Sequence, residues 1–170
     1  SGYIDRFNGR IMFSIPNSSG KIAAFAGRVF ESGEPAKYIN SPETPIYNKS
    51  KILYGLHETK QVIRKRKSVI VVEGYLDFLQ LYQSGVHNCV AVSGTAFTDQ
   101  HALQLKRFCN NVYLAYDGDS AGKAAAIRAS YVLLRAGISA FIVNIPKDLD
   151  PDDWVKRDGN TPFLEAVKKG

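Results

Sequence analysis

The spacing of apolar and polar residues changes after the first third of the chain. Residues 9–15 and 21–30 are largely apolar runs that flank the turn-forming stretch PNSSG, which predicts an antiparallel hairpin. Residues 31–50 contain three prolines and little periodicity, so we expect a connecting loop there. Residues 51–67 are predicted to form a helix that becomes basic towards its end. This part of the chain is therefore predicted to be a small α+β unit.

From residue 68 onwards, short apolar runs alternate with helical patterns. Four runs have the length and composition of buried strands: 68–72, 88–94, 111–116 and 139–145. Between them, residues 75–85 carry apolar side chains at helical spacing, Thr98 can cap a second helix, and Ser120 begins a long helix that ends at Gly137. This alternation predicts a parallel sheet with right-handed crossovers, flanked by helices.

The predicted elements divide the chain into three regions. Residues 1–66 form a partial N-terminal α+β subdomain, residues 67–147 hold the parallel sheet, and residues 148–170 add an acidic loop and two short helices. The fold class is therefore α/β: a parallel sheet flanked by helices, preceded by a small α+β subdomain with an antiparallel hairpin.

Composition adds few limits. With 45% hydrophobic and 22% charged residues over 170 positions, the chain can bury a substantial core, and its apolar runs are too short to cross a membrane. The first residues lack the apolar segment of a signal peptide, and Cys89 and Cys109 lie in apolar runs as reduced core thiols do, so we expect a cytoplasmic protein. The net charge of +6 is compatible with a polyanionic partner.

Acidic residues follow three of the four predicted strands. Glu73 follows the first, Asp117-Gly118-Asp119 follow the third, and the fourth leads into a loop with Asp148, Asp150, Asp152 and Asp153. The second strand ends in Ser93-Gly94-Thr95, whose small side chains allow a close backbone approach. Ligands of open α/β sheets bind beyond the carboxyl ends of the strands. Clustered carboxylates suit Mg²⁺ or Mn²⁺, so the pattern predicts a metal-dependent phosphoryl-transfer site.

Each acidic segment also has a purely structural interpretation. Asp-Gly-Asp is common in turns, Glu73 and Asp77 could complement a helix dipole, and Asp150 could cap a helix that has Pro151 at its first position. The coincidence of all these segments at equivalent strand ends favours the metal site. The stretch GDSAGKA at 118–124 is not a P-loop, because three residues instead of four separate its glycines and no Ser or Thr follows the lysine.

Three segments resemble the signature elements of the Toprim domain: VVEGYLD at 71–77, YDGDSAG at 116–122 and DLDPDD at 148–153. The stretch AKYINSPETPIYNKSKILYGL at 36–56, together with the preceding hairpin, is similar to the catalytic core of bacterial replicative primases of the DnaG family. The similarity extends over nearly the whole chain, and its KYINSPET element is not shared with topoisomerases. The resemblance implies a Toprim-type parallel sheet.

The resemblance also implies a DNA-directed RNA polymerase that makes short RNA primers from NTPs on single-stranded DNA during replication. It implies Mg²⁺ or Mn²⁺ held by five acidic residues: Glu73, Asp117, Asp119, Asp150 and Asp152. The catalytic set that it implies is Glu73, Asp77, Asp117 and Asp119, and the residues matching the nucleotide- and DNA-binding groove are Arg28, Lys37, Asn40 and Lys49. The replicative helicase of the primosome is an implied partner, through a domain expected outside these 170 residues.

Two other functions remain open from the residues. A Toprim nuclease or topoisomerase fragment would use the same acidic set to cleave DNA. A nucleic-acid-binding module would keep the acidic loops for structural reasons only, without catalysis. Ribonucleotide incorporation distinguishes the primase from the first alternative, and the effect of removing Asp117 and Asp119 distinguishes it from the second.

Overall fold

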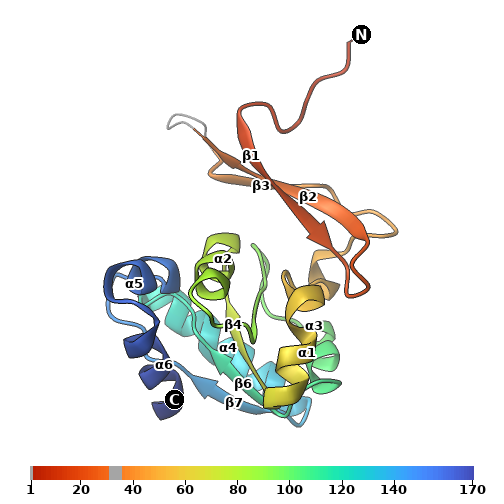
Figure 1. Cartoon of the computed structure of the whole chain (residues 1–170). Coiled ribbons are helices and arrows are strands. Elements are labelled where there is room, and N and C mark those ends of the chain that lie inside the picture. Colours follow the sequence, from red (N-terminus) through yellow and green to blue (C-terminus); the bar gives the residue numbers. More distant parts are fainter. Residues whose placement is uncertain (1, 31–35) are drawn as a thin grey trace.

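Two separate sheets organise the chain (Figure 1). In this computed structural model, which describes residues 2–30 and 36–170, a three-stranded antiparallel sheet precedes a four-stranded parallel sheet that is covered by helices. This is the α/β arrangement that the alternation of strand and helix patterns predicts. The division into regions at residues 66 and 147 stays a prediction.

The predicted hairpin forms the first sheet. Strand β1 (Arg10–Pro16) pairs antiparallel with β2 (Ile22–Val29) around the PNSSG turn. The loop prediction for residues 31–50 is wrong over β3 (Tyr38–Asn40), which pairs with β2 at the edge of the sheet, and residues 31–35 lie outside the described residues. A three-residue edge strand has too few positions to show alternation, so only its pairing partner defines it.

The helix predicted over residues 51–67 begins later than expected. A short 3₁₀ helix, η1 (Lys49–Lys51), comes first, and α1 (Leu56–Arg66) follows. Between them the backbone of Tyr54 is extended, because its N–H and C=O pair with those of Ala91 at 2.9 and 3.0 Å. This tertiary pairing overrides the helical pattern and ties the segment to the second sheet.

All four predicted parallel strands are present: β4 (Ser68–Val72), β5 (Cys89–Ala91), β6 (Asn111–Leu114) and β7 (Ser139–Ile142). Their order in the sheet is β5-β4-β6-β7, with every neighbouring pair parallel. Three of them end earlier than the apolar runs predict. The remaining apolar residues of the runs continue beyond the strands, towards the edge where the acidic residues lie.

Helices cover the two faces of the parallel sheet, and a hydrophobic layer lies between the sheet and the helices on each face. One layer includes buried residues of α1, α3 (Asp99–Lys106) and α4 (Ser120–Arg135), and the other those of α2 (Tyr75–Gln83), α5 (Pro151–Asp158) and α6 (Asn160–Lys169). Strand β4 alternates between them, with Val69 and Val71 in the first and Ile70 and Val72 in the second. This strand is buried on both faces, as its uninterrupted apolar sequence predicts.

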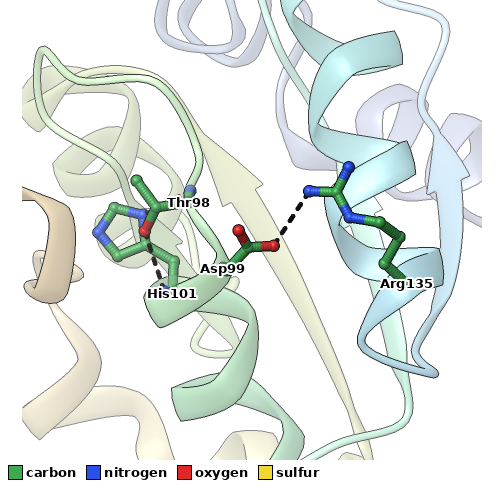
Figure 2. A network of polar contacts seen from close by, with 4 residues as sticks. All are labelled: Thr98, Asp99, His101 and Arg135. Carbon is green, nitrogen blue, oxygen red and sulfur yellow. Dashed lines mark hydrogen bonds and ion pairs between the residues drawn. The ribbon is translucent and has the colours of Figure 1, made fainter.

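A network of polar contacts fixes the start of α3 (Figure 2). Thr98 caps the helix as predicted: its hydroxyl accepts the backbone N–H of His101 at 3.2 Å, and its own N–H donates to His101 Nδ1 at 3.2 Å. Burial lowers the pKa of His101 to about 4, so the ring is neutral and its Nε2–H donates to the carbonyl of Lys49 at 3.1 Å. Asp99 pairs with Arg135 of α4 at 3.1 Å, and these contacts join η1, α3 and α4.

Cys89 and Cys109 are free thiols and both are buried, as their apolar surroundings predict. Burial raises the pKa of each thiol to about 12, so they are inert core residues. In the described part of the chain, none of the helices combines the length and hydropathy that a membrane span requires.

The long helix α4 offers a direct test of the core assignment. Leu133 is fully buried in the first hydrophobic layer, whereas its neighbour Leu134 is 57% exposed. We expect Leu133→Ala to lower the free energy of unfolding by about 2–5 kcal/mol, because it leaves a cavity. Leu134→Ala should stay within about 0.5 kcal/mol. Urea denaturation of both variants measures the difference, and equal effects would contradict the assigned face of α4.

Candidate active site

The order of the strands creates a crevice at one edge of the parallel sheet. The chain passes from β4 through α2 to β5 on one side, and from β6 through α4 to β7 on the other. At such a switch point the loops after two neighbouring strands diverge and leave room for a ligand. Glu73 follows β4 and Asp117 follows β6, and the backbone N–H of Asp117 donates to Glu73 Oε1 at 3.3 Å. The two predicted acidic positions therefore lie side by side.

A cavity of about 490 Å³ lies over these strand ends. Six acidic side chains line it: Glu73, Asp77, Asp117, Asp150, Asp152 and Asp153. Ser93 and Gly94 at the end of β5 form part of its wall, as their small side chains suggest. Convergence of carboxylates from distant parts of the sequence is thus a feature of the structure.

A second acidic group lies at the start of α5. Asp150 caps this helix by accepting the N–H of Asp153 at 2.7 Å, and Pro151 occupies the first helical position. One oxygen each of Asp150, Asp152 and Asp153 lie within 4.8 Å of one another. Within residues 2–30 and 36–170, no other three His, Cys or acidic side chains lie this close to one another. The five predicted metal ligands therefore do not form one group of this kind.

Asp77 connects the two acidic groups. Its Oδ2 accepts the N–H of Gly74 at 2.9 Å and its Oδ1 accepts the N–H of Asp152 at 3.2 Å, so it links the start of α2 to the start of α5. The residue is only 7% exposed. Burial, reinforced by the charge of Asp150, raises its pKa to about 7. Asp77 is thus a buried bridge whose side chain is partly protonated near neutral pH.

The other carboxylates also show the cost of their proximity. Burial and the neighbouring charge of Glu73 raise the pKa of Asp117 to about 6, and Lys37 partly opposes this shift. Burial likewise raises the pKa of Glu73, to which the charge of Asp119 adds. A bound cation would relieve this repulsion, and the donors are hard oxygen atoms. The residues therefore fit a divalent metal of the Mg²⁺ or Mn²⁺ type.

Asp119 occupies a different position from the other predicted ligands. It is exposed, does not line the cavity, and caps α4 by accepting the N–H of Gly122 at 2.7 Å. The glycines on either side of it are required by close contacts. A Cβ on Gly122 would lie 2.3 Å from the carbonyl oxygen of Asp117, and one on Gly118 would lie 2.0 Å from that of Pro146. The spacing of YDGDSAG therefore reflects a tight turn as well as acidic chemistry.

The wall formed by the first sheet is basic and polar. Arg28, Lys37 and Asn40 line the cavity, as predicted for the groove, and the Arg28 guanidinium lies 5.8 Å from the centre of the Tyr38 ring. Lys49 does not line this cavity; it belongs to η1 and lines a separate small pocket with Tyr47 and Tyr75. The structure thus brings three of the four predicted groove residues to the acidic residues.

Tyr75 fastens this basic wall to the parallel sheet. Its hydroxyl donates to Asn40 Oδ1 at 3.0 Å, and Asn40 Nδ2 donates to the carbonyl of Ser93 at 3.5 Å. The Tyr75 ring stacks on Phe13 of β1, with centres 5.3 Å apart, and contacts Tyr38 of β3. One side chain at the start of α2 therefore joins this helix to the first sheet beside the cavity.

Lys156, which lines the cavity, was missed from the sequence, and Asp153, which also lines it, was noted in the acidic loop but not among the ligands. Lys156 Nζ lies 2.6 Å from Asp152 Oδ2, and this hydrogen bond raises the pKa of the lysine. The signal in the sequence was the spacing of Asp152 and Lys156: residues four positions apart on a helix lie on the same face, next to each other. Tyr75 carried no signal beyond that of an apolar helical position.

The raised pKa of Asp77 predicts a pH dependence of stability in metal-free protein. The folded chain retains a proton that the unfolded chain loses above about pH 4, so stability should fall as pH rises from about 4 to 7. The total change should be on the order of 2–4 kcal/mol. Asp77→Asn should flatten this slope in urea titrations with EDTA, whereas Asp99→Asn on the exposed start of α3 should keep it. A slope unaffected by Asp77→Asn would contradict the burial of this carboxylate.

Comparison with known proteins agrees with this geometry. The family described as "DNA primase catalytic core, N-terminal domain" matches residues 1–60, and the Toprim-like family matches residues 70–155. The DNA primase of Listeria monocytogenes is 42% identical over 167 residues and that of Staphylococcus epidermidis 40%; these matches cover 98% of this chain. The chain spans only 27–28% of the length of these two relatives.

Solved structures give the same result. The zinc-binding and RNA polymerase domains of the Aquifex aeolicus primase superpose with a TM-score of 0.94 at 37% identity, covering 99% of this chain and 42% of that one. A DNA primase domain from Pseudomonas aeruginosa gives 0.89 at 40% identity, with 97% and 52% covered. A DnaG primase catalytic domain bound to single-stranded DNA also gives 0.89, at 39% identity, with 97% and 54% covered. From the fold, the acidic cavity and these matches, the chain belongs to the Toprim-like family, within the group formed by the catalytic cores of DnaG-type primases.

Proposed function

We propose that this chain is part of the catalytic core of an enzyme that joins ribonucleotides into short RNA primers on single-stranded DNA. The observation that supports this most directly is the pairing of opposite charges across one cavity. Carboxylates from three strand connections line one side, and Arg28, Lys37 and Asn40 line the side formed by the first sheet. A substrate with negative phosphates and a need for divalent metal fits between the two sides.

The proposed reaction is nucleotidyl transfer. The 3′-hydroxyl of the growing primer loses its proton to water and attacks the α-phosphate of an NTP. A new P–O bond forms, the bond from the α-phosphorus to the bridging oxygen breaks, and pyrophosphate leaves. Bound Mg²⁺ or Mn²⁺ supplies charge neutralisation at the phosphates and lowers the pKa of the attacking hydroxyl. The residues that would hold metal are Glu73, Asp117 and Asp119 after the strands and Asp150 and Asp152 at α5. No covalent intermediate with a side chain is required.

Each residue has a distinct proposed task. Glu73 and Asp117 are adjacent and half-buried, and the backbone N–H of Asp117 donates to Glu73 Oε1, so the Glu73 carboxylate is held in place. Asp77 acts as a buried bridge that positions the backbone of Asp152. Asp119 caps α4 with one oxygen and its charge acts on Glu73, so its second oxygen is proposed to bind metal although the residue does not line the cavity.

The basic wall is proposed to bind the triphosphate. The Arg28 guanidinium can contact two phosphate oxygens at once and is supported from one side by the Tyr38 ring, while Lys37 adds a mobile point charge. Lys49 lies outside the cavity and is proposed to contact the template or primer backbone. One similar DnaG primase catalytic domain was solved with bound single-stranded DNA, and we extend this binding to the present chain as a proposal. The RNA primer, NTPs and the replicative helicase of the primosome are further proposed partners, and a cytoplasmic location remains the expectation.

Removal of one central carboxylate tests the catalytic assignment. We expect Asp117→Asn to lower the rate of ribonucleotide incorporation by about 10²-fold or more, because it removes a charged oxygen ligand. Asp148→Asn is the matched control: it removes the same charge from an exposed residue outside the cavity, at a left-handed backbone position with φ of 61° that Asn tolerates. The assay is primer synthesis on single-stranded template, with the chain extended to the length of its relatives.

Three outcomes separate the candidate functions. Full activity in Asp117→Asn would remove the catalytic role of that residue. Nicking of supercoiled DNA with Mg²⁺ and no ribonucleotide incorporation would favour a Toprim nuclease. Unchanged single-strand binding and metal affinity in the double variant Asp117→Asn and Asp119→Asn would favour a non-catalytic binding module.

The salt dependence of DNA binding tests the basic wall separately. Each lysine or arginine that contacts a phosphate releases about one counterion, so Lys37→Gln should reduce the slope of log K against log salt by about 1. Lys65→Gln, at the exposed end of α1 and outside the cavity, is the control and should leave the slope unchanged. Fluorescence anisotropy with a labelled single strand measures both slopes. Equal slopes for the two variants would argue against phosphate contact by Lys37.

A further inference from the structure

One cation of the cavity comes from the same helix as the acidic group that it contacts. Helix α5 carries Asp152 and Asp153 in its first turn and Lys156 one turn later. The ion pair joins Lys156 Nζ to Asp152 Oδ2 at 2.6 Å. The Asp152 side chain is 10% exposed and the Lys156 side chain 53% exposed, so the ammonium covers a nearly buried carboxylate and still contacts solvent.

The ammonium contacts one of the carboxylates that a metal ion at this acidic group would also contact. Asp152 contributes one of the three oxygens that lie within 4.8 Å of one another, with Asp150 and Asp153. The backbone N–H of Asp152 is held by Asp77 and that of Asp153 by Asp150, so this turn of α5 is fixed. A divalent ion and an ammonium group cannot both contact Asp152 Oδ2 closely without strong mutual repulsion. Metal that binds through Asp152 Oδ2 therefore requires the lysine to move.

From this geometry we infer that Lys156 is a positioning residue that competes with divalent metal for Asp152, and so sets the metal concentration at which this acidic group fills. In metal-free protein its ammonium neutralises the buried carboxylate and keeps the group in place. When metal binds, the ammonium leaves Asp152 and remains on the cavity wall. The inference rests on the proposed metal-binding role of Asp150 and Asp152.

The chemistry of lysine suits this exchange. Its four-carbon stem is flexible and its charge is compact, so Nζ can leave Asp152 while the backbone of α5 stays fixed. An arginine at this position would hold a carboxylate with two parallel hydrogen bonds and would release it less readily. The neighbouring Arg157 pairs with Asp158 at 2.7 Å outside the cavity, so it provides a cation of the same helix that takes no part in the exchange.

The test combines Mn²⁺ binding with thermal unfolding of the 170-residue chain. Free Mn²⁺ is measured by electron paramagnetic resonance for the original chain, Lys156→Gln, Lys156→Arg and the charge-matched control Arg157→Gln. We expect Lys156→Gln to bind Mn²⁺ about tenfold more tightly than the control, since one competing ion pair to a buried carboxylate is removed. Lys156→Arg should bind Mn²⁺ no more tightly than the original chain.

Thermal unfolding gives a readout that a merely structural ion pair would not produce. In EDTA, Lys156→Gln should unfold at a lower temperature than the original chain, because Asp152 is left buried without a cation. With saturating Mn²⁺ the two should unfold at the same temperature. An equal loss with and without Mn²⁺, together with an affinity equal to that of Arg157→Gln, would overturn the inference.

Asp152→Asn separates this inference from the function on which it rests. If the variant loses a Mn²⁺ site and Lys156→Gln behaves like the control, only the competition by Lys156 is wrong. If Asp152→Asn binds Mn²⁺ like the original chain, metal binding at this group is wrong as well and the inference is overturned with it. Neither measurement depends on primer synthesis, so failure of the proposed polymerase activity is recognised independently.

Discussion

Repulsion between carboxylates at one edge of a sheet is the constraint around which this molecule is built. Backbone N–H groups hold the acidic side chains in place: those of Gly74, Asp117, Gly122, Asp152 and Asp153 each donate to one of them. Most of these donors belong to the first turns of helices, where N–H groups have no partner within the helix and favour negative charge. The compensation is incomplete, because burial, reinforced by the neighbouring carboxylates, keeps the pKa values of Asp77 and Asp117 raised. A cation bound at this edge of the sheet would therefore stabilise the ionised carboxylates.

Structural and functional roles coincide in the same residues. Asp119 and Asp150 each cap a helix with one oxygen, and each is among the proposed metal ligands. A cap fixes the side chain and leaves the second oxygen available, so the helix start serves as a rigid mount for a ligand. The structural interpretation of these aspartates and the metal interpretation are therefore compatible, although the sequence presents them as alternatives.

Local pattern was sufficient for those features whose causes lie close together in the chain. The uninterrupted apolar sequence of β4, the cap at Thr98 and the proline at the start of α5 were all predicted, because each depends on a few neighbouring residues. The proximity of Glu73 and Asp117 followed from the general behaviour of parallel sheets and from the family resemblance, whereas the order of the strands was not predicted. What escaped depends on distant partners: β3 exists through its pairing with β2, and Tyr54 leaves the helical pattern through its pairing with Ala91. The position of Lys49 outside the cavity is of this kind, since His101 fixes its backbone from another helix.

The contacts of Tyr75 have a consequence for how a ligand enters. Its hydroxyl binds Asn40, its ring stacks on Phe13, and Asn40 in turn binds the carbonyl of Ser93. These contacts hold the basic and acidic walls of the cavity at a fixed distance from each other, without the help of a bound ligand. The width of the cavity is therefore set before a ligand binds. The conformational entropy that a flexible cavity would lose at each binding event is lost only once, when the polypeptide folds.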